Sequence, residues 1–545
     1  MKKIWKACLA FMAMLTLSLP MFAQDAEKSL DERINDAFMP IAEWWEGFVL
    51  TSIPIAGNDI PLVVMLLVLG ATFFTVYFSF VNIRRFPLAI NVVRGKYDGI
   101  EKKDPVTTDS VNVVDGDIVD TIKDEGEEGE VSHFQALATA VSGTVGLGNI
   151  AGVAVAIAVG GPGATFWMIV CGLLGMSSKF VECTLGVAYR DVDKDGTVYG
   201  GPMYYLSRGL SERNFATVGK VLGGLFAVLC VGASFGGGNA FQSNQAAQQL
   251  SSLMGLEGGA TGFMIGIVLA ILVGIVIIGG IKRIASVTEK IVPFMAGIYV
   301  IACLIIIFAN ISYVDDAFGE IFSGAFTPAA GLGGLLGVLI VGFQRAAFSN
   351  EAGAGSAAIA HSAVKTRYPA SEGIVALLEP FIDTVVICTM TALVIIFFNA
   401  EQAEFMYGST EGSSVITLTG EQLGGVDLTS AAFGSVLPWF PYVLTIAIVL
   451  FAFSTMISWS YYGLQSWKYL FGRGKNADLA YKVLFLIFVV IGAAATLDAV
   501  IKFSDAMILA LVFPNMIGLF FLFPRVKEEL NRYLKAIADF TKVNA

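Results

Sequence analysis

Apolar segments long enough to cross a membrane recur along nearly the whole of this 545-residue chain. A helix needs about 20 mostly apolar residues to span the hydrocarbon core of a bilayer. Hydrophobic residues make up 56% of the sequence and charged residues only 14%, a balance that excludes an ordinary soluble protein. We therefore predict an all-α polytopic membrane protein with eleven spans. They lie near residues 60–82, 134–159, 164–189, 221–250, 262–280, 287–309, 331–360, 373–398, 432–466, 483–497 and 505–523.

Positive charges test this set of spans, because loops on the cytoplasmic side of a membrane are rich in lysine and arginine. If residue 24 lies outside, the predicted inside segments contain 26 lysines and arginines, whereas the predicted outside loops contain only Lys502. This asymmetry supports the number of spans. It predicts a multi-pass protein of the cell (inner) membrane, with the N-terminus outside after signal removal and the C-terminus in the cytoplasm.

The first residues are typical of a secretory signal. Three lysines precede an apolar run that ends at Ala23, which predicts a cleaved signal peptide over residues 1–23. An uncleaved first helix is the alternative. Residues 24–59 are expected to form an amphipathic segment at the outer surface, with Trp44 and Trp45 at the level of the lipid headgroups.

The chain between the signal and the main bundle adds two further segments. We expect an extra first transmembrane helix at 60–82 and a cytoplasmic loop at 83–133, and a cytoplasmic tail at 524–545 closes the chain. Within the loop, residues 104–130 carry ten Asp and Glu and one Lys. This stretch is either an interaction or regulatory insertion or, as we favour, a solvated acidic loop. The net charge of −11 comes largely from such solvent segments and indicates no nucleic-acid partner.

Residues 142–152, SGTVGLGNIAG, interrupt the second predicted span with four glycines and with the polar residues Thr144 and Asn149. Glycine costs about 1 kcal/mol relative to alanine inside a helix. Irregular backbone within a membrane is tolerated only where it is buried in protein or lines a cavity. Close helix packing would explain Gly148 and Gly152, which lie four residues apart. It does not explain the polar residues, whereas an unwound segment that binds ions and substrate does.

A second glycine-rich interruption, GFQRAAFSNEAGAGS, lies at residues 342–356 within the seventh predicted span. The two interrupted spans are five spans apart, so they cross the membrane in opposite directions. This arrangement predicts ten core helices in a 5+5 inverted repeat, with core helices 1 and 6 broken. The first repeat would cover residues 134–309 and the second residues 331–523.

Arg345 and Glu351 lie in the second interruption at membrane depth. Charged groups there are costly and are usually functional or paired. We expect the two to form a gate or a structural ion pair across the break, with Glu182 and Asp383 as alternative partners.

The chain offers little that suggests catalysis. Its two histidines, His133 and His361, lie near the predicted inner ends of spans, where we expect surface or interfacial positions. They are too sparse for an obvious metal site or a Ser–His pair, so we do not expect an enzyme. The cysteines beyond the signal fall in apolar segments without metal-ligand spacing and are expected to pack.

Several blocks of sequence resemble known transporters. TVGLGN at residues 144–149 is similar to the unwound first helix of the LeuT-type sodium-coupled transporters. GGPGATFWMIVCGLLG at 160–175 resembles the signature of the alanine/glycine:cation symporter family, and GNAFQSNQ, FSNEAGAGSA and AFSTMISWSYYG resemble further blocks of that family. The resemblance implies a LeuT-type fold and a sodium-coupled symporter that imports a small neutral amino acid. A channel or facilitator for small polar solutes is the alternative.

The resemblance also implies a substrate site. Main-chain N–H groups at the first break suit an α-carboxylate, because the N-terminal end of a half-helix carries a positive partial charge. Where the family often has a glycine and a bulky aliphatic residue, this chain has Ala346 and Ala347, so a pocket facing Ala347 would also admit serine or glutamine. The implied site comprises Thr144, Gly146, Leu147, Gly148, Asn149, Gly237, Gln242, Phe343, Ala347, Thr455 and Trp459, with Trp459 and Phe343 as apolar walls.

Sodium, the implied coupling ion, prefers hard oxygen ligands. The resemblance implies a site between core helices 1 and 8. Its ligands would be the carbonyls of Ser142, Val145 and Phe451 and the hydroxyls of Ser454 and Thr455. The alternative for the two hydroxyls is a hydrogen bond back to their own helix.

Overall fold

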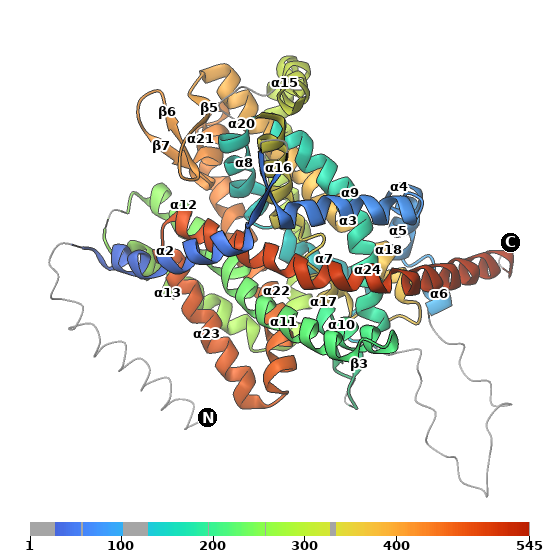
Figure 1. Cartoon of the computed structure of the whole chain (residues 1–545). Coiled ribbons are helices and arrows are strands. Elements are labelled where there is room, and N and C mark those ends of the chain that lie inside the picture. Colours follow the sequence, from blue (N-terminus) through green and yellow to red (C-terminus); the bar gives the residue numbers. More distant parts are fainter. Residues whose placement is uncertain are drawn as a thin grey trace, which may run out of the picture.

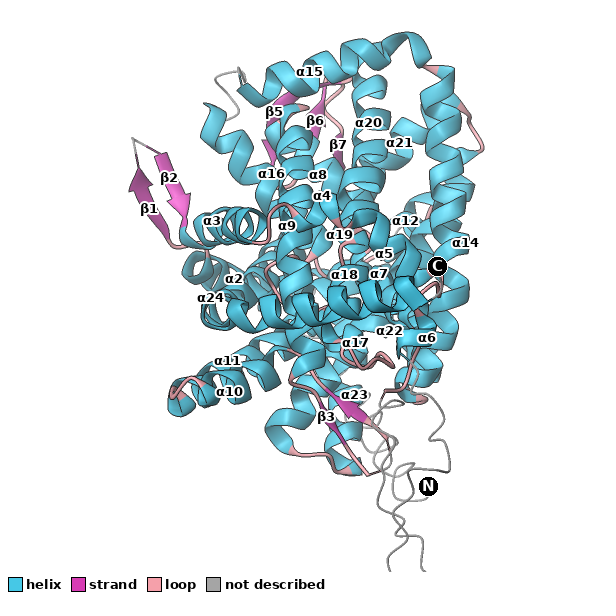
Figure 2. Cartoon of the chain, turned by 90° about the vertical axis from the view of Figure 1, so that its right-hand side faces the viewer, coloured by secondary structure: helices cyan, strands magenta, loops and turns pink. Residues whose placement is uncertain are grey.

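Helices make up almost the whole structure (Figure 2). The computed structural model describes residues 28–55, 58–101, 129–194, 196–256, 258–326 and 334–543. The predicted signal peptide and most of the acidic stretch at 104–130 lie outside the described residues. In the described part, seven helices are long and apolar enough to cross a membrane, or eight when the bent pair His133–Thr144 and Gly148–Gly160 counts as one span. The chain is therefore a helical polytopic membrane protein.

The helices follow the predicted spans closely. Two of those spans, near residues 60–82 and 262–280, form shorter apolar helices of 16 and 17 residues. The span near 331–360 divides into the helices Gly334–Asn350 and Ala358–His361, so the number eleven stays a prediction. The helices of the first half are α2 (Leu30–Val49), α3 (Leu62–Tyr77), α4 (Val81–Arg84), α5 (Phe86–Val93), α6 (Asp98–Glu101), α7 (His133–Thr144), η4 (Gly148–Gly152), α8 (Val153–Gly160), α9 (Gly163–Ala188), α10 (Pro202–Glu212), α11 (Ala216–Phe235), η5 (Gly236–Ala240), α12 (Phe241–Met254), α13 (Thr261–Ile277) and α14 (Gly280–Ala309). Those of the second half are η6 (Ile311–Tyr313), α15 (Val314–Phe326), α16 (Gly334–Asn350), α17 (Ala358–His361), α18 (Pro369–Val375), α19 (Leu378–Pro380), η8 (Phe381–Cys388), α20 (Thr389–Gln402), α21 (Val426–Val436), α22 (Phe440–Phe471), α23 (Lys475–Ala494) and α24 (Leu497–Val543).

Three small antiparallel sheets correct the prediction of an all-α chain. All of them lie in segments that connect helices, where the hydropathy that defines spans says nothing about strands. Glycines with positive φ lie in the described turns between strands, as at Gly412 with φ 59° between β5 and β6. The strands are β1 (Ser52–Ile55) with β2 (Asn58–Pro61), β3 (Asp191–Val192) with β4 (Val198–Tyr199), and β5 (Phe405–Glu411) with β6 (Ser414–Thr417) and β7 (Gln422–Gly424).

The first glycine-rich interruption breaks its helix, as its sequence predicts. Ser132 caps α7 through a capping box with Gln135, and α7 ends at Thr144. Val145 has ψ 83°, which is far from a helical value. The two helical pieces on either side of the break meet at an angle of 49°.

The second glycine-rich interruption also breaks its helix. α16 ends at Asn350, and the connection to α17 uses left-handed backbone at Gly353 (φ 91°) and Gly355 (φ 83°). Glu351, with φ 56°, adopts the same region although it carries a side chain, a conformation that costs about 1–2 kcal/mol.

Besides the π-helical η4 at the first break, two more predicted spans contain π-helical segments that their hydropathy does not reveal. η5 interrupts the span predicted at 221–250, and η8 interrupts the one predicted at 373–398. Such widened turns often occur at functional sites. η8 contacts η4 and α16, and a Cβ on Gly237 of η5 would lie 3.1 Å from the ring of Phe348 on α16, so both segments lie beside the broken helices.

The long helix α24 crosses the molecule and packs against α2, α3, α9 and α11 (Figure 1). α22 packs against α7, α11, α12 and α14, while α16 packs against α9 and α8. These contacts bring the break in α7, the π-helical η5, the end of α16 and the middle of α22 to one buried place.

Candidate functional site

The break in α7 presents main-chain donors to side chains. The N–H of Leu147 donates to Oε1 of Gln242 on α12 at 3.0 Å, and the N–H of Gly146 donates to Oδ1 of Asn149 at 2.9 Å. Gln242 is itself oriented by a hydrogen bond from its Nε2 to the carbonyl of Gly237 at 2.8 Å. These N–H groups therefore have side-chain oxygens as acceptors, in place of the helical carbonyls that a continuous helix would supply.

Two glycines allow neighbouring elements to approach closely at this place. A Cβ on Gly146 would lie 2.4 Å from Oγ1 of Thr455 on α22, and a Cβ on Gly238 of η5 would lie 2.2 Å from Cγ of Trp459. Either side chain would push α22 away. Gly152 differs, because a Cβ there would meet nothing within 4 Å. The expected packing role of Gly152 is therefore wrong.

Two hydrogen bonds join α7 to α22 directly. Oγ1 of Thr455 donates to the carbonyl of Ser142 at 2.9 Å, and Oγ of Ser142 donates to the carbonyl of Ser454 at 2.8 Å. Oγ of Ser454 donates to the carbonyl of Phe451 at 3.0 Å, so the back-bonded alternative is seen for Ser454 but Thr455 bonds across to α7. Four residues of the implied sodium site thus form one connected set. Val145, the fifth, caps α7 with a carbonyl turned out of the helical ladder.

The two polar side chains of the first interruption have protein partners. Oγ1 of Thr144 donates to the carbonyl of Ala140 on its own helix at 3.2 Å. Nδ2 of Asn149 donates to Oδ1 of Asp383 at 2.7 Å, and Oγ of Ser349 donates to Oδ2 of the same carboxylate at 2.8 Å. Asn149 therefore links the break in α7 to η8 and, through Asp383, to α16.

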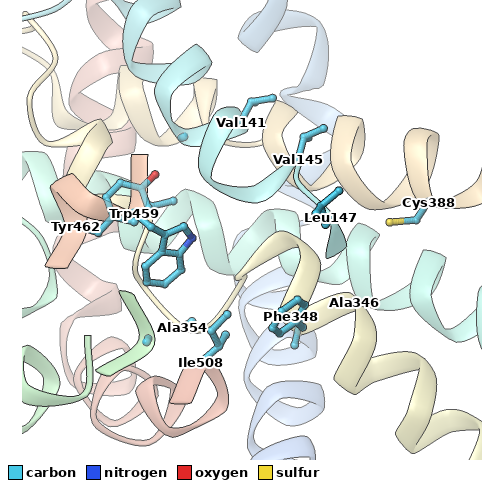
Figure 3. Packing of buried hydrophobic residues seen from close by; sticks show 14 of the residues in the cluster. Val141, Val145, Leu147, Ala346, Phe348, Ala354, Cys388, Trp459, Tyr462 and Ile508 are labelled. Carbon is cyan, nitrogen blue, oxygen red and sulfur yellow. The ribbon is translucent and has the colours of Figure 1, made fainter. Parts of the chain in front are cut away.

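Trp459 does more than the apolar wall that the resemblance implies. Figure 3 shows its ring among the buried hydrophobic residues near the two breaks. The ring lies against Gly238, and its indole N–H donates to Oε1 of Glu351 at 2.9 Å. The Glu351 carboxylate also accepts from the hydroxyl of Ser356. Trp459, which is 1% exposed, therefore holds the broken end of α16 as well as lining the site.

Phe348 is an apolar wall that sequence reasoning missed. A Cβ on Gly148 would lie 3.4 Å from its ring, and a Cβ on Gly237 would lie 3.1 Å from it, so Phe348 fills the space between the broken helix and η5. The implied wall Phe343 lies one helical turn and a half earlier, with its ring centroid 6.5 Å from that of Trp167. The one available signal was that Phe348 is the aromatic residue directly before the polar residues of the second interruption.

The other implied residues divide into two groups. Hydrogen bonds and close contacts bring one group together, namely Gly146, Leu147, Gly148, Gly237, Gln242, Thr455 and Trp459. Ala347 is buried in α16 directly before Phe348, and its orientation toward a substrate stays a prediction.

The expected pair between Arg345 and Glu351 is wrong. Arg345 forms an ion pair with Asp505 on α24, and its guanidinium carbon lies 5.7 Å from the centroid of Phe348. α16 continues without a break to Asn350, so residues six apart lie on different faces of it. Neither alternative partner meets Arg345, since Asp383 bonds Asn149 and Glu182 accepts from the side chain of Asn515.

The expected surface positions of the two histidines are also wrong. His361 is 0% exposed and His133 is 9% exposed. Both bond the carboxylate of Glu372, His361 through Nδ1 at 2.5 Å. Nε2 of His361 lies 3.4 Å from Glu379, which accepts from Lys179 at 3.0 Å. Hydropathy places such residues at span ends, but it does not show that buried carboxylates pair with them.

The chain is similar to known transporters. A model of the sodium:alanine symporter family matches residues 49–543. The chain is 40% identical over 474 residues to the sodium/alanine symporter AgcS of Methanococcus maripaludis, covering 87% of this chain and 94% of that protein. It is 36% identical over 407 residues to the probable sodium/glutamine symporter GlnT of Bacillus subtilis, covering 74% and 79% of the two chains. Among solved structures, MhsT in complex with L-phenylalanine aligns with a TM-score of 0.47 at 14% identity, over 73% of this chain and 99% of that one. This chain belongs to the sodium:alanine symporter family.

Proposed function

We propose that this chain, as a sodium-coupled amino acid symporter, imports a small neutral amino acid by alternating access about the breaks in α7 and α16. The observation that carries the proposal is the junction of α7 and α22. There Ser142, Ser454 and Thr455 bring hard oxygens together next to the main-chain donors of Gly146 and Leu147.

The substrate carboxylate would bind at the break in α7. The N–H of Leu147 donates to a side chain, Gln242, which an α-carboxylate can replace as acceptor. Gln242 would then turn to the substrate. Trp459 and Phe348 would close the apolar side of the pocket.

The oxygen atoms between α7 and α22 fit sodium. The carbonyls of Ser142, Val145 and Phe451 and the hydroxyls of Ser454 and Thr455 include no sulfur or imidazole ligand. Binding there would tighten the contact between α7 and α22 and thereby order the neighbouring substrate site. A coupling free energy of about 1–3 kcal/mol is enough for such cooperation.

The two breaks support the LeuT-type arrangement. We propose eleven spans, of which the last ten form a 5+5 inverted repeat with α7–α8 and α16–α17 as the broken core helices. The proposed topology keeps the outer N-terminus and the cytoplasmic C-terminus, since the lysine and arginine count favours it.

Reconstitution into proteoliposomes tests the proposal. Labelled alanine should accumulate above its external concentration when a sodium gradient points inward, and accumulation should stop when choline replaces sodium. A facilitator would equilibrate alanine without ever concentrating it. Uptake that is unaffected by the removal of sodium would contradict the proposed coupling.

Competition in the same assay tests the size of the site. If Ala347 faces the pocket, unlabelled serine and glutamine should displace labelled alanine. Failure of both to compete would show a site limited to alanine and glycine.

A further inference from the structure

A small basic cavity lies where the chain leaves α3 and passes the C-terminal half of α24. It has a volume of about 120 Å³, and Arg84, Arg85 and Lys527 line it. No aspartate or glutamate is among its described lining residues. The nearest carboxylates along α24, those of Glu528 and Glu529, pair with Arg525 instead. The cavity therefore gathers positive charge without a matching negative charge from the protein.

Four of the six other described residues that line the cavity are apolar, namely Phe78, Val81, Leu530 and Leu534, and the other two, Ser79 and Asn531, are polar. Nζ of Lys527 lies 5.9 Å from the ring centroids of both Tyr77 and Phe78. A free, fully hydrated anion would gain no binding free energy from contact with these apolar side chains. Positive groups beside apolar side chains suit an amphiphile whose anionic group continues into hydrocarbon.

Strained backbone builds the cavity. Ser79 and Phe80 are consecutive residues in the left-handed region, with φ 55° and 58°, a conformation that side chains disfavour. The turn brings Arg84 and Arg85 against α24. Such strain persists mainly where function requires it.

The same turn leaves apolar side chains in the open. Phe80 is 51% exposed and Ile83 is 66% exposed, directly beside the arginines. In water these side chains would be unfavourable, but at the boundary of a bilayer they can dip into the acyl region.

The cavity lies at the inner surface of the membrane in the topology proposed above, on which this inference rests. In that topology α3 runs from outside to inside, so Arg84 and Arg85 lie at the inner surface, as does Lys527 after the last span. The inner leaflet carries anionic lipids that attract such groups. We propose that this cavity binds the phosphate of an anionic phospholipid of the inner leaflet, with the guanidinium groups on the phosphate oxygens and the acyl chains along Phe80 and Ile83.

Binding of short-chain lipids to the purified full chain in detergent tests the proposal by calorimetry. Three probes are compared, namely short-chain phosphatidylglycerol, short-chain phosphatidylcholine and inorganic phosphate. Phosphatidylglycerol should bind most tightly, and its affinity should fall as salt rises because the contacts are exposed to screening. Equal affinity for phosphatidylcholine would overturn the proposal, and so would equal affinity for inorganic phosphate, which would indicate a free-anion site.

Substitutions locate the binding. Arg84→Gln, Arg85→Gln and Lys527→Gln should each weaken phosphatidylglycerol binding by about fivefold, and the triple variant by more. A matched control removes three exposed positive charges from other predicted inside segments, through Arg213→Gln, Lys220→Gln and Lys282→Gln. The control should bind as the unmodified chain does.

A triple variant that binds phosphatidylglycerol as the unmodified chain does would overturn the site, as would equal losses in the variant and the control. The double variant Arg84→Lys with Arg85→Lys keeps the charge and should retain most of the affinity, which separates lost contacts from misfolding. Alanine uptake is measured separately on the same preparations. Absent uptake contradicts the proposed function, whereas absent lipid selectivity contradicts the lipid site alone.

Discussion

Oγ1 of Thr455 donates a 2.9 Å hydrogen bond to the carbonyl of Ser142. Ser142 lies in the last turn of α7, three residues before the C-cap Val145. The reverse bond, from Oγ of Ser142 to the carbonyl of Ser454, is 2.8 Å long. α22 is therefore joined to the broken helix at the very place where the oxygens of the proposed sodium site converge. An ion bound there would act on a contact that lies next to the proposed substrate site.

Two glycines of the first interruption should respond differently to alanine. In Gly146→Ala the new Cβ would lie 2.4 Å from Oγ1 of Thr455, whereas in Gly152→Ala it meets open space. Overpacking costs about 1–3 kcal/mol, so Gly146→Ala should reduce alanine affinity by about 10- to 100-fold through this cost. Gly152→Ala should leave affinity and uptake unchanged. Equal behaviour of the two variants in a binding assay would contradict the close contact.

The indole N–H of Trp459 should matter apart from its ring. Trp459→Phe keeps an aromatic wall but removes the donor to Glu351, and a hydrogen bond to a charged group contributes about 1.5–3 kcal/mol. We expect a lower melting temperature and weaker alanine binding. Trp467→Phe is the control, because the ring nitrogen of Trp467 has no hydrogen-bond partner among the described residues. A melting temperature that falls no further in Trp459→Phe than in the control would argue against this role.

His361 should stabilise the protein through its carboxylates. His361→Leu removes one of the two histidine partners of Glu372 and the neighbour of Glu379, at a position that is 0% exposed. Breaking a buried pair costs about 3–5 kcal/mol. His361→Gln keeps a donor and should lose less, so the order of melting temperatures should be unmodified, glutamine, leucine. A leucine variant as stable as the glutamine variant would contradict the buried network.

Exchanging the charged residues Arg345 and Asp505 should restore part of the stability that is lost when one of them is replaced. Arg345→Gln leaves the Asp505 carboxylate, 7% exposed, without its cation, and should lower stability by about 3–5 kcal/mol. The exchange Arg345→Asp with Asp505→Arg should recover part of this loss in thermal denaturation. If the stability lost in the double exchange equals the sum of the losses in Arg345→Asp and Asp505→Arg, the direct ion pair does not contribute to stability.

Much of the architecture could be predicted from local sequence. The glycine clusters at 142–152 and 342–356 locate both broken helices, because glycine weakens a helix wherever it lies. The residues grouped at the first break follow from the resemblance. Gln242 and Thr455 contact that break as the resemblance implies.

The predictions that were wrong concerned residues whose partners are distant in the sequence. Arg345 pairs with Asp505, 160 positions away, and His133 with Glu372, 239 positions away. Such pairs are fixed by how helices pack and have no local signature. The π-helical η5 and η8 were missed for a related reason, since hydropathy is insensitive to one extra residue in a turn.

The sodium dependence of alanine binding tests whether the coupling sodium binds between α7 and α22. Ser454→Ala removes a proposed sodium ligand that is not a proposed substrate ligand, and Ser458→Ala, one turn further along α22 and equally buried, is its control. We expect the sodium concentration for half-maximal alanine binding to rise by about 10- to 100-fold in Ser454→Ala, a range typical of a disturbed metal site. It should stay unchanged in Ser458→Ala. An unchanged sodium dependence in a folded Ser454→Ala variant would contradict a sodium site between α7 and α22.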